Sequence, residues 1–378
     1  MQKAFEIGPI RPPSEAESLL LRITRNCSWN KCKFCNLYTG HNFSARPIEE
    51  VKADIDQVAL MREDILSWTS DGEDESRITE KIYSLPLEMA QRYFHVLQWM
   101  GSGEDSVFLQ DANTVALSFN RLREILVYLR EKLPQVKRVT SYGRVDSLDK
   151  FSPEQLIGLR EAGLDRIHSG FESGSDKVLE FINKGYTKAQ EIEVGRKVKE
   201  SGVELSIYYM PGVGGADLSD DNALETADVI DKINPDFVRV RTFVPRTGTG
   251  LMEDIKSGKM KECTDIQKMQ ELKKMIENVN SADGYLYSDH IINLFEDVNG
   301  NLKTDKQNML DIFEAFEKLG KNDRRRYQIA RRMGMVRSHD YMRLLRDEQI
   351  KMIDSQLLEL DTDEKFEHFI SRLLRRGI

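Results

Sequence analysis

Six apolar segments typical of strands recur along the first two-thirds of the chain, and a segment typical of a helix follows each of them. Strands that alternate with helices at this spacing form right-handed βαβ units, which build a parallel sheet. Six such units predict an α/β fold, a partial (β/α)6 TIM-like barrel rather than a closed eightfold one. The six segments are residues 19–23, 106–113, 137–143, 165–174, 203–215 and 236–250.

Two parts of the chain interrupt or follow this alternation. Amphipathic patterns on both sides of the polar stretch SDGEDESR predict a helical insertion over about residues 69–104, after the first strand. From about residue 256 the pattern is helical, with no clear strands. We therefore expect an N-terminal extension over residues 1–16, the barrel over 17–255 and a C-terminal helical region over 256–378.

Composition is typical of a globular protein. Of 378 residues, 40% are hydrophobic and 31% are charged, and no apolar run approaches the roughly 18–20 residues of a membrane helix. The N-terminal sequence lacks the basic-then-apolar pattern of a signal peptide. The formal net charge of −8 disfavours a protein that coats nucleic acid through its overall field, but it permits a local basic patch. We expect a cytoplasmic protein.

Three of the four cysteines lie within nine residues, in ITRNCSWNKCKFCNLY after the first strand. This density favours metal ligands over a disulfide framework. Cys27, Cys32 and Cys35 suit a [4Fe–4S] cluster with one iron left open. They also suit a structural zinc ion with His41 as the fourth ligand. Cys263 stands alone in a polar segment, and we expect it to be a plain helical residue.

Polar residues end five of the predicted strands. The carboxyl ends of parallel strands meet at one mouth of a barrel, so these residues are expected to line a common site. They are Cys27, Asp111–Asn113, Ser141–Arg144, Gly170–Gly174 and Gly212–Gly215.

The cysteine loop, the aromatic Phe34 and GFESGSDKVLEFINKGYT after the fourth strand together resemble the radical S-adenosylmethionine (SAM) enzymes. The resembling branch includes oxygen-independent coproporphyrinogen oxidase, the methylthiotransferases and the elongator-type catalytic subunits, and the resemblance covers roughly residues 17–250. It implies a [4Fe–4S] cluster on the three cysteines. It also implies that SAM binds the open iron and is cleaved to a 5′-deoxyadenosyl radical, with an electron donor such as flavodoxin or ferredoxin.

The resemblance also implies cofactor contacts for single residues. Phe34 would contact adenine, or else be a plain core residue. Asp111 and Asn113 stand where the family has its clamp for the methionine ammonium, and their oxygens can accept hydrogen bonds from it. Lys184 would pair with the methionine carboxylate. Glu172 matches the polar residue after the fourth strand, although it would also suit a helix cap.

Three further residues complete the implied pocket. Ser141 and Tyr208 would line it, and Tyr208 would equally suit the core. Gly212, in GVGG, would let the backbone approach adenine or ribose closely. The chain departs from the family in two places. Its cysteine spacing is C-x4-C-x2-C rather than the commoner C-x3-C-x2-C, and DAN replaces a clamp of the Gly-Gly-Glu type.

The sequence narrows the chemistry more than the substrate. Since there is no second group of cysteines, we disfavour methylthiotransferase and other two-cluster chemistry. The lack of a separate N-terminal domain disfavours a cobalamin-dependent methylase. We therefore expect a single-cluster oxidoreductase that works under anaerobic conditions. Its reaction would start with the abstraction of hydrogen from a substrate carbon.

The C-terminal region contains two more polar groups. The stretch 288–306, with Asp289, His290 and Asn293, would fold back over the barrel mouth or remain at the surface. Eight arginines follow, which suit RNA or another anionic ligand, or a solvated helix face. The alternatives to the enzyme are a zinc-stabilised barrel that binds RNA, and a family member that binds SAM or a tetrapyrrole without turnover. The arginines are Arg324, Arg325, Arg326, Arg331, Arg332, Arg337, Arg343 and Arg346.

Overall fold

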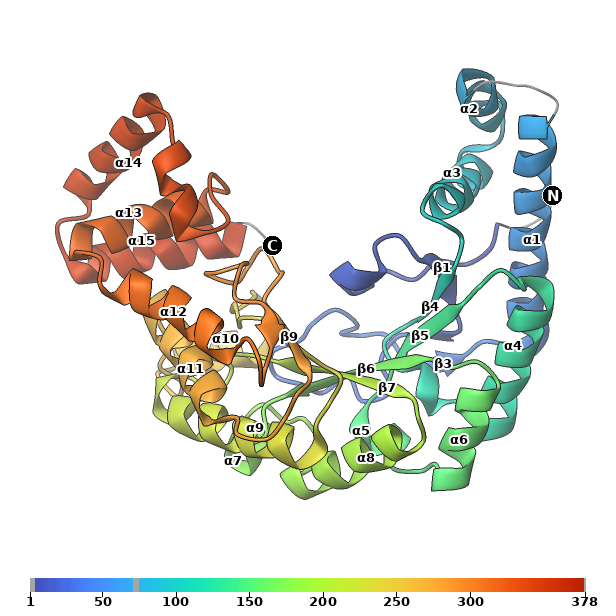
Figure 1. The fold of residues 1–378 in the computed structure, drawn as a ribbon, viewed down its shortest axis with the longest axis horizontal. Helices are drawn as coiled ribbons and strands as arrows, with labels where there is room; N and C mark the ends of the chain where they lie inside the picture. Colours follow the sequence, from blue (N-terminus) through green and yellow to red (C-terminus); the bar gives the residue numbers. More distant parts are fainter. Residues whose placement is uncertain (1–3, 71–74, 377–378) are drawn as a thin grey trace. The chain divides into compact units, whose positions relative to one another are not determined.

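The computed structural model describes residues 4–70 and 75–376 (Figure 1). The chain divides into two compact units. The first unit comprises the chain up to Asn30, Tyr38–Ser169 and Lys197–Leu205, and the second comprises Lys31–Leu37, Gly170–Arg196 and the chain from Ser206 onward. The domain boundaries expected at residues 16 and 255 stay a prediction.

The first unit is built on a parallel sheet. Residues from neighbouring strands pair in register, as Leu20 does with Phe108 and Phe108 with Thr140. The strands are apolar and largely buried, as expected for a sheet covered by helices. In spatial order they are β1 (Leu19–Arg22), β4 (Ser106–Gln110), β5 (Arg138–Tyr142) and the first part of β6 (Arg166–Glu172).

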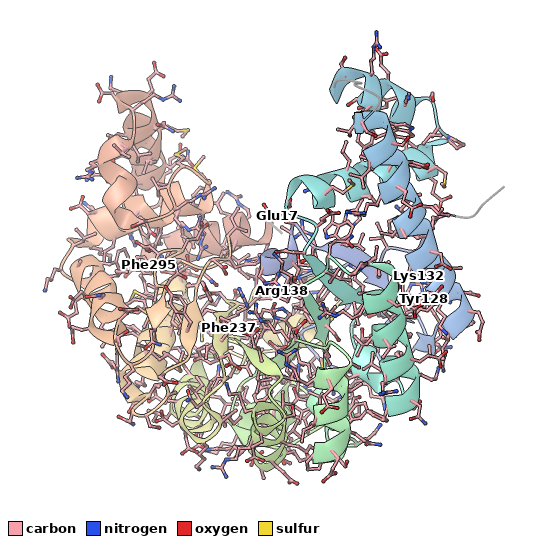
Figure 2. All side chains as sticks on the ribbon, turned by 45° about the vertical axis from the view of Figure 1, so that its right-hand side comes forward. Glu17, Tyr128, Lys132, Arg138, Phe237 and Phe295 are labelled. Atoms are coloured by element: carbon pink, nitrogen blue, oxygen red, sulfur yellow. The ribbon has the colours of Figure 1, made fainter. Side chains whose placement is uncertain are left out.

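Helices α1 (Ile48–Ser70), α4 (Phe119–Lys132) and α6 (Pro153–Glu161) lie side by side in the first unit (Figure 1). The outer face of α4 carries Tyr128 and Lys132, and the Lys132 ammonium lies 5.4 Å from the Tyr128 ring centroid (Figure 2). The inner face buries residues three and four positions apart, which is the amphipathic pattern of a surface helix. These are Leu122, Ile125, Leu126 and Leu129.

Helices lie between the first two barrel strands, as predicted, but they begin at Ile48, and the expected bounds of about 69–104 stay a prediction. They are α1, α2 (Glu75–Tyr83) and α3 (Leu87–Gly101). Helices α2 and α3 share a small apolar core of their own around Ile78 and Ile82. A short antiparallel pair of strands, β2 (Thr24–Arg25) and β3 (Ser44–Ala45), was not predicted from the sequence pattern. It flanks residues 26–38, called the cysteine segment below.

The residues before β1 pack into the first unit. Phe5 is fully buried, and the Gly8 N–H donates to Gln110 Oε1 at 2.7 Å. In return, the Gln110 amide donates to the Gly8 and Ile10 carbonyls. The N-terminal segment is therefore tied to the end of β4, where candidate site residues begin.

The second unit continues the parallel arrangement from the end of β6. The six predicted barrel strands are observed as β1 and β4 to β8, which confirms the predicted strand order. Two short strands follow, and β9 pairs with β8 in parallel and with β10 antiparallel. The strands are β7 (Glu204–Tyr209), β8 (Phe237–Val240), β9 (Tyr285–Tyr287) and β10 (Gly300–Asn301).

The expectation that the C-terminal region lacks strands is therefore wrong. Strands of three and two residues are too short to show a period of two, and polar residues surround them. Ring contacts stabilise β9. Tyr285 and Tyr287 lie 4.6 Å apart between centroids, and the Arg239 guanidinium is 4.9 Å from the Tyr287 ring.

Helices make up the rest of the second unit. An aromatic core joins α12 and α13 to the loop after β9, which carries Phe295 (Figure 2). The Phe295 ring stacks on Tyr327 with 5.4 Å between centroids. Among the described helices, none combines the length and apolar character needed to cross a bilayer. The helices are α7 (Asp176–Phe181), α8 (Lys188–Glu200), α9 (Ser219–Ile233), α10 (Gly250–Lys256), α11 (Asp265–Asn278), α12 (Lys306–Glu317), α13 (Lys321–Arg332), α14 (Asp347–Glu359) and α15 (Asp363–Arg376). The part of α8 from Lys197 onward and the first two residues of β7 belong to the first unit.

Candidate functional site

Asp111, at the end of β4, binds both ends of the cysteine segment within the first unit. Its fully buried Oδ2 accepts hydrogen bonds from Arg22 Nη2 at 2.8 Å and from the Asn26 N–H at 3.1 Å. Its Oδ1 accepts the hydroxyl of Tyr38. Asn26 precedes Cys27 in the sequence and Tyr38 lies beyond the last cysteine. Burial and the hydrogen bond to Asp111 raise the pKa of Tyr38 far above its usual value, so its hydroxyl keeps its proton for this bond.

Asn113 holds the beginning of the same segment. Its side-chain NH₂ donates to Ser28 Oγ at 2.7 Å and to Ser147 Oγ at 2.8 Å. Its carbonyl oxygen accepts the Arg144 N–H at 3.0 Å. The structure thus gives Asn113, like Asp111, partners inside the protein. The expected contact of both residues with the methionine ammonium stays a prediction.

Two asparagines shape the cysteine segment itself. Asn26 and Asn30 have φ angles of 67° and 50°, in the left-handed region that asparagine enters more readily than most residues. Asn30 donates from its side chain to the Tyr38 carbonyl at 2.6 Å and from its backbone to Cys27 Sγ at 3.4 Å. An asparagine three residues after the first cysteine was the sequence signal for this turn.

Lys33 anchors the second part of the cysteine segment in the second unit. Its N–H donates to the Ile182 carbonyl, and its carbonyl accepts the Leu251 N–H, both at 2.9 Å. Its ammonium forms an ion pair with Asp254 at 2.8 Å. The segment is therefore fixed by the end of α7 and by α10.

Phe34, Glu172 and Lys184, three of the predicted cofactor residues, come together in the second unit. The Lys184 ammonium lies 3.0 Å from Glu172 Oε1 and 5.4 Å from the Phe34 ring centroid. Both charged residues are more than nine-tenths buried. Tyr186 closes the group, because its hydroxyl donates to the Gly170 carbonyl at 2.5 Å. The site thus pairs a buried cation with a carboxylate and an aromatic face.

Glu172 adopts a backbone conformation that is unusual for a glutamate. Its φ is 67°, in the left-handed region, which costs an L-residue about 1–2 kcal/mol. The Met210 N–H donates to its carbonyl at 2.9 Å and helps to hold it there. A Cβ on Gly170 would collide with the Glu172 carboxylate, so a side chain at that position would displace the carboxylate from its present place. Such outliers gather at functional sites.

The remaining implied pocket residues lie at or near strand ends. Ser141 is buried in β5 and donates to the Tyr142 carbonyl at 2.8 Å. Tyr208 is buried in β7. Gly212 begins the glycine loop, the segment Gly212–Gly215, with a φ of 84° that a residue with a side chain would rarely adopt. Their contact with a cofactor stays a prediction.

The three clustered thiols are accessible. Cys27 and Cys32 are partly exposed and Cys35 is exposed, on a segment without helix or strand. In the part of the chain that the structure describes, no three His, Cys, Asp or Glu side chains form a ready-made metal site, with or without His41. Cysteine thiolates are the usual ligands of iron–sulfur clusters, so three accessible thiols on an irregular loop are nevertheless suitable ligands for one.

Cys263 differs from these three. It is buried directly before α11 rather than within a helix as expected, and burial raises the pKa of its thiol to about 12. A thiol of that pKa is protonated at neutral pH and is a poor metal ligand.

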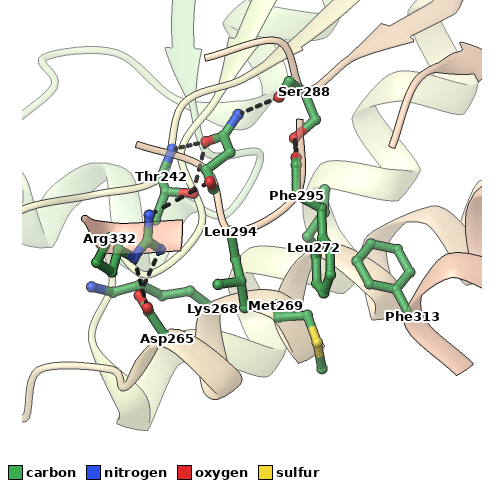
Figure 3. A pocket seen from close by; sticks show the side chains of 11 residues that line it. Thr242, Asp265, Lys268, Met269, Leu272, Ser288, Leu294, Phe295, Phe313 and Arg332 are labelled. Carbon is green, nitrogen blue, oxygen red and sulfur yellow. Dashed lines mark hydrogen bonds and ion pairs between the residues drawn. The ribbon is translucent and has the colours of Figure 1, made fainter. Parts of the chain in front are cut away.

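The loop around Asn293 is bound to the end of β8 and to the residues after it, while its expected position over the barrel mouth stays a prediction. Asn293 Oδ1 accepts the N–H and hydroxyl of Thr242, at 3.0 and 2.8 Å, and its NH₂ donates to the Val240 carbonyl at 2.9 Å. Figure 3 shows Thr242 and Ser288 in this network. Burial and the nearby cations of Arg241, Arg331 and Arg246 lower the pKa of His290 to about 4, so its imidazole is neutral at pH 7.

Two of the eight C-terminal arginines have buried side chains that stabilise this loop. For these two, the interpretation as part of a solvated helix face or an RNA-binding patch is wrong. Arg331 donates to the Asn293 and Ile291 carbonyls at 2.9 and 2.7 Å. Arg332 forms a two-bonded ion pair with Asp265, at 2.8 and 2.9 Å (Figure 3). Runs of charge in a sequence do not reveal such partners.

Comparison with known sequences gives curated relatives of partial length. The chain is 24% identical over 213 residues to a tRNA-2-methylthio-N(6)-dimethylallyladenosine synthase from Thermoanaerobacter sp. (strain X514), over 55% of this chain and 42% of the relative. It is 28% identical over 162 residues to a protein of the same name from Aquifex aeolicus, over 40% and 37%. The chain thus spans less than half the length of these relatives.

Among solved structures, the chain is similar to coproporphyrinogen III oxidase from Escherichia coli, with a TM-score of 0.42 and 15% identity over 65% of this chain and 48% of that one. It is also similar to methylornithine synthase, with a TM-score of 0.42 and 17% identity over 69% and 64%.

The model of the family described as the radical SAM superfamily matches residues 21–227, more than half of the chain. The matched span begins in β1 and contains all three clustered cysteines, Glu172, Lys184 and the glycine loop. Enzymes of this family bind a [4Fe–4S] cluster and SAM, the cofactors that the resemblance implied. The chain belongs to the radical SAM superfamily.

Proposed function

We propose that this chain is a single-cluster radical SAM enzyme that acts on a carbon–hydrogen bond of its substrate. Cys27, Cys32 and Cys35 would hold the cluster. When bound, the cluster and SAM supply a 5′-deoxyadenosyl radical through one-electron cleavage of the sulfonium. The observation that carries this proposal is the grouping of Phe34, Glu172 and Lys184 beside a segment that bears two of those cysteines.

Burying the ion pair of Glu172 and Lys184 costs free energy, and we infer that the pair is kept because it binds the cofactor. Removing two charges from water costs several kcal/mol per ion, and the mutual attraction repays this only with good geometry. A site that must bind the ammonium and carboxylate of SAM needs one group of each sign. We assign Lys184 to the methionine carboxylate, Glu172 to a cationic or hydroxyl group of SAM, and Phe34 to the adenine face.

Asp111 and Asn113 would act mainly through the cysteine segment. Their hydrogen bonds to Asn26, Tyr38 and Ser28 hold the backbone on both sides of the thiols. A carboxylate has about four acceptor positions, and Asp111 uses three. Since Asp111 is fully buried, its fourth position would accept the methionine ammonium only after a local rearrangement that exposes the carboxylate.

The substrate is proposed only by class of reaction. The curated relatives are named for tRNA modification, whereas the net charge of this chain is −8 and Arg331 and Arg332 are committed to protein carbonyls and to Asp265. These observations do not favour RNA binding through Arg324–Arg346, and RNA is best tested as one substrate among others. A small electron-transfer protein such as flavodoxin or ferredoxin would be the electron donor, and a cytoplasmic location stays a prediction.

The protein should cleave SAM slowly even without its substrate. Anaerobically purified protein is expected to be brown and to absorb at about 400 nm. After incubation with dithionite and SAM, chromatography should detect 5′-deoxyadenosine and methionine. A colourless, zinc-containing protein would favour the zinc-stabilised alternative. Protein with a full cluster but no 5′-deoxyadenosine would favour a binding protein without turnover.

The three clustered cysteines should be individually necessary for the cluster, and Cys263 should not be. Three thiolates are the smallest set that ligates a [4Fe–4S] cluster with one iron open, so replacing Cys27, Cys32 or Cys35 by Ala should prevent cluster binding. Iron and sulfide are counted after anaerobic reconstitution. Cys263→Ala serves as the matched control, and the assignment fails if this variant loses iron as completely as Cys32→Ala.

Replacing Lys184 by Met should leave the cluster near wild type but weaken SAM binding about ten- to a hundredfold, since a charge-assisted hydrogen bond is lost. The electron paramagnetic resonance signal of the reduced cluster, titrated with SAM, measures this. Lys177→Met, which replaces an exposed lysine of α7, is the matched control.

A double variant separates cofactor binding from stability. Glu172→Gln combined with Lys184→Met removes both charges of the buried pair, so its thermal stability should exceed that of Lys184→Met while SAM binding stays weak. Wild-type affinity in the double variant would remove both residues from the cofactor site.

A further inference from the structure

Glu271, on α11, is a buried residue, 2% exposed, whose carboxyl accepts four hydrogen bonds. Its Oε1 accepts the Gly212 N–H at 3.0 Å, the Asn222 side-chain NH₂ at 2.6 Å and the Tyr209 hydroxyl at 3.1 Å. Its Oε2 accepts the Ser219 hydroxyl at 2.6 Å. One carboxyl thus ties the end of β7, the glycine loop and the start of α9 to a helix of the C-terminal region.

The same C-terminal segment supports the glycine loop at other points. A Cβ on Gly212 would lie 2.8 Å from Lys268 Cγ, so the lysine chain packs directly on that glycine. The Ala216 N–H, just after the loop, donates to the Lys261 carbonyl at 2.9 Å. Three glycines in four residues leave the loop with large conformational freedom, which these contacts restrict.

This support lies outside the span that the family model matches. The family model ends at residue 227, whereas Glu271 stands 59 positions beyond Gly212. The loop belongs to the matched span, and the groups that fix it do not. The C-terminal region would therefore complete the cofactor site from outside that span.

We propose that Glu271 is a positioning residue that fixes the glycine loop in the conformation that accepts SAM. This inference rests on the proposed function and extends it, because it gives a residue beyond the matched span control over cofactor affinity. Glu271 acts through the Gly212 N–H and touches no reacting atom.

The charge of Glu271 decides how strongly the loop is held. Burial raises the pKa of Glu271 to about 7, although the hydrogen bonds from Ser219, Gly212, Asn222 and Tyr209 oppose that rise. An ionised carboxylate is an acceptor only, and it matches four donors. Hydrogen bonds to an ionised acceptor are roughly twice as strong as neutral ones. The bond to Gly212 should therefore strengthen as the pH rises through about 7.

Other ionisable groups surround this carboxyl. Tyr209, on β7, keeps its proton because burial and Glu271 raise the pKa of its phenol, and the Cys263 thiol has a pKa of about 12. Neither changes charge near neutral pH. Two charged groups lie nearby. Lys268, on α11, packs its chain on Gly212. Lys274 forms an ion pair with Asp220 of α9, and both residues line a surface cavity that Glu271 also lines.

Glu271→Gln keeps the size of the side chain and removes its charge. The matched control is Glu277→Gln, the same change on the exposed side of α11. Hydrogen exchange followed by mass spectrometry on protein without cofactor should show the segment around Gly212–Ala216 about tenfold less protected in Glu271→Gln than in the control above pH 8. Equal protection in the two variants would overturn the positioning role.

A second readout separates this role from a general loss of structure. Loop protection in the wild type should rise through about pH 7, and this rise should be absent in Glu271→Gln. Tyr209→Phe removes one donor from Oε1, so the midpoint should move to higher pH. An unchanged midpoint in Tyr209→Phe, or a rise that persists in Glu271→Gln, contradicts the inference even if one variant folds poorly.

SAM affinity then tests the link to the cofactor. In the wild type it should increase about tenfold from pH 6 to pH 8, and in Glu271→Gln it should stay at the low-pH value. If SAM fails to bind any variant, the proposed function is wrong while the exchange result still decides the role of Glu271. If Glu271→Gln shows much faster hydrogen exchange in the glycine loop but binds SAM with wild-type affinity, the inferred link between this loop and the cofactor is wrong.

Discussion

A carboxylate taken out of water must be matched by hydrogen-bond donors, and the loops of the candidate site are built around this requirement. Asp111 binds the residues on both sides of the cysteines, Glu172 pairs with Lys184, and Glu271 holds the glycine loop. Each of these carboxylates lies at the end of a strand or on a helix that faces one. The loops are thus fixed by the protein alone, which reduces the ordering that a cofactor must impose when it binds.

The strand order could be predicted because buried parallel strands are apolar runs of four to seven residues that end in polar ones, as in SVFLQD. The helical insertion was equally visible from its 3.6-residue period. Strands β9 and β10 were missed, because two or three residues carry no period and tyrosines among polar residues do not distinguish a strand from a loop. Strand β9 pairs with β8, about 50 residues earlier, and β10 pairs with β9.

For the candidate site, a sequence places residues at strand ends but does not show their partners. Phe34, Glu172 and Lys184 were expected together and lie together. Asp111 and Asn113 lie where expected, yet their partners Asn26 and Ser28 stand 85 positions earlier and leave no local signal. Glu271 was not expected at all, because an isolated glutamate on an amphipathic helix normally faces solvent. Only the packing of α11 against α9 reveals its burial.

The carboxylate of Asp111 offers the most direct test, since it holds the cysteine segment without ligating iron. Asp111→Asn keeps the size of the side chain but replaces one acceptor oxygen with a donor, which opposes the donors from Arg22, Asn26 or Tyr38. Iron and sulfide are counted after anaerobic reconstitution, with Asp146→Asn, on a partly exposed residue of the same unit, as the control. A well-folded Asp111→Asn protein that keeps all its cysteines but loses most of its cluster is the predicted result. A full and stable cluster in that variant would contradict the claim that buried carboxylates fix the loops of the site.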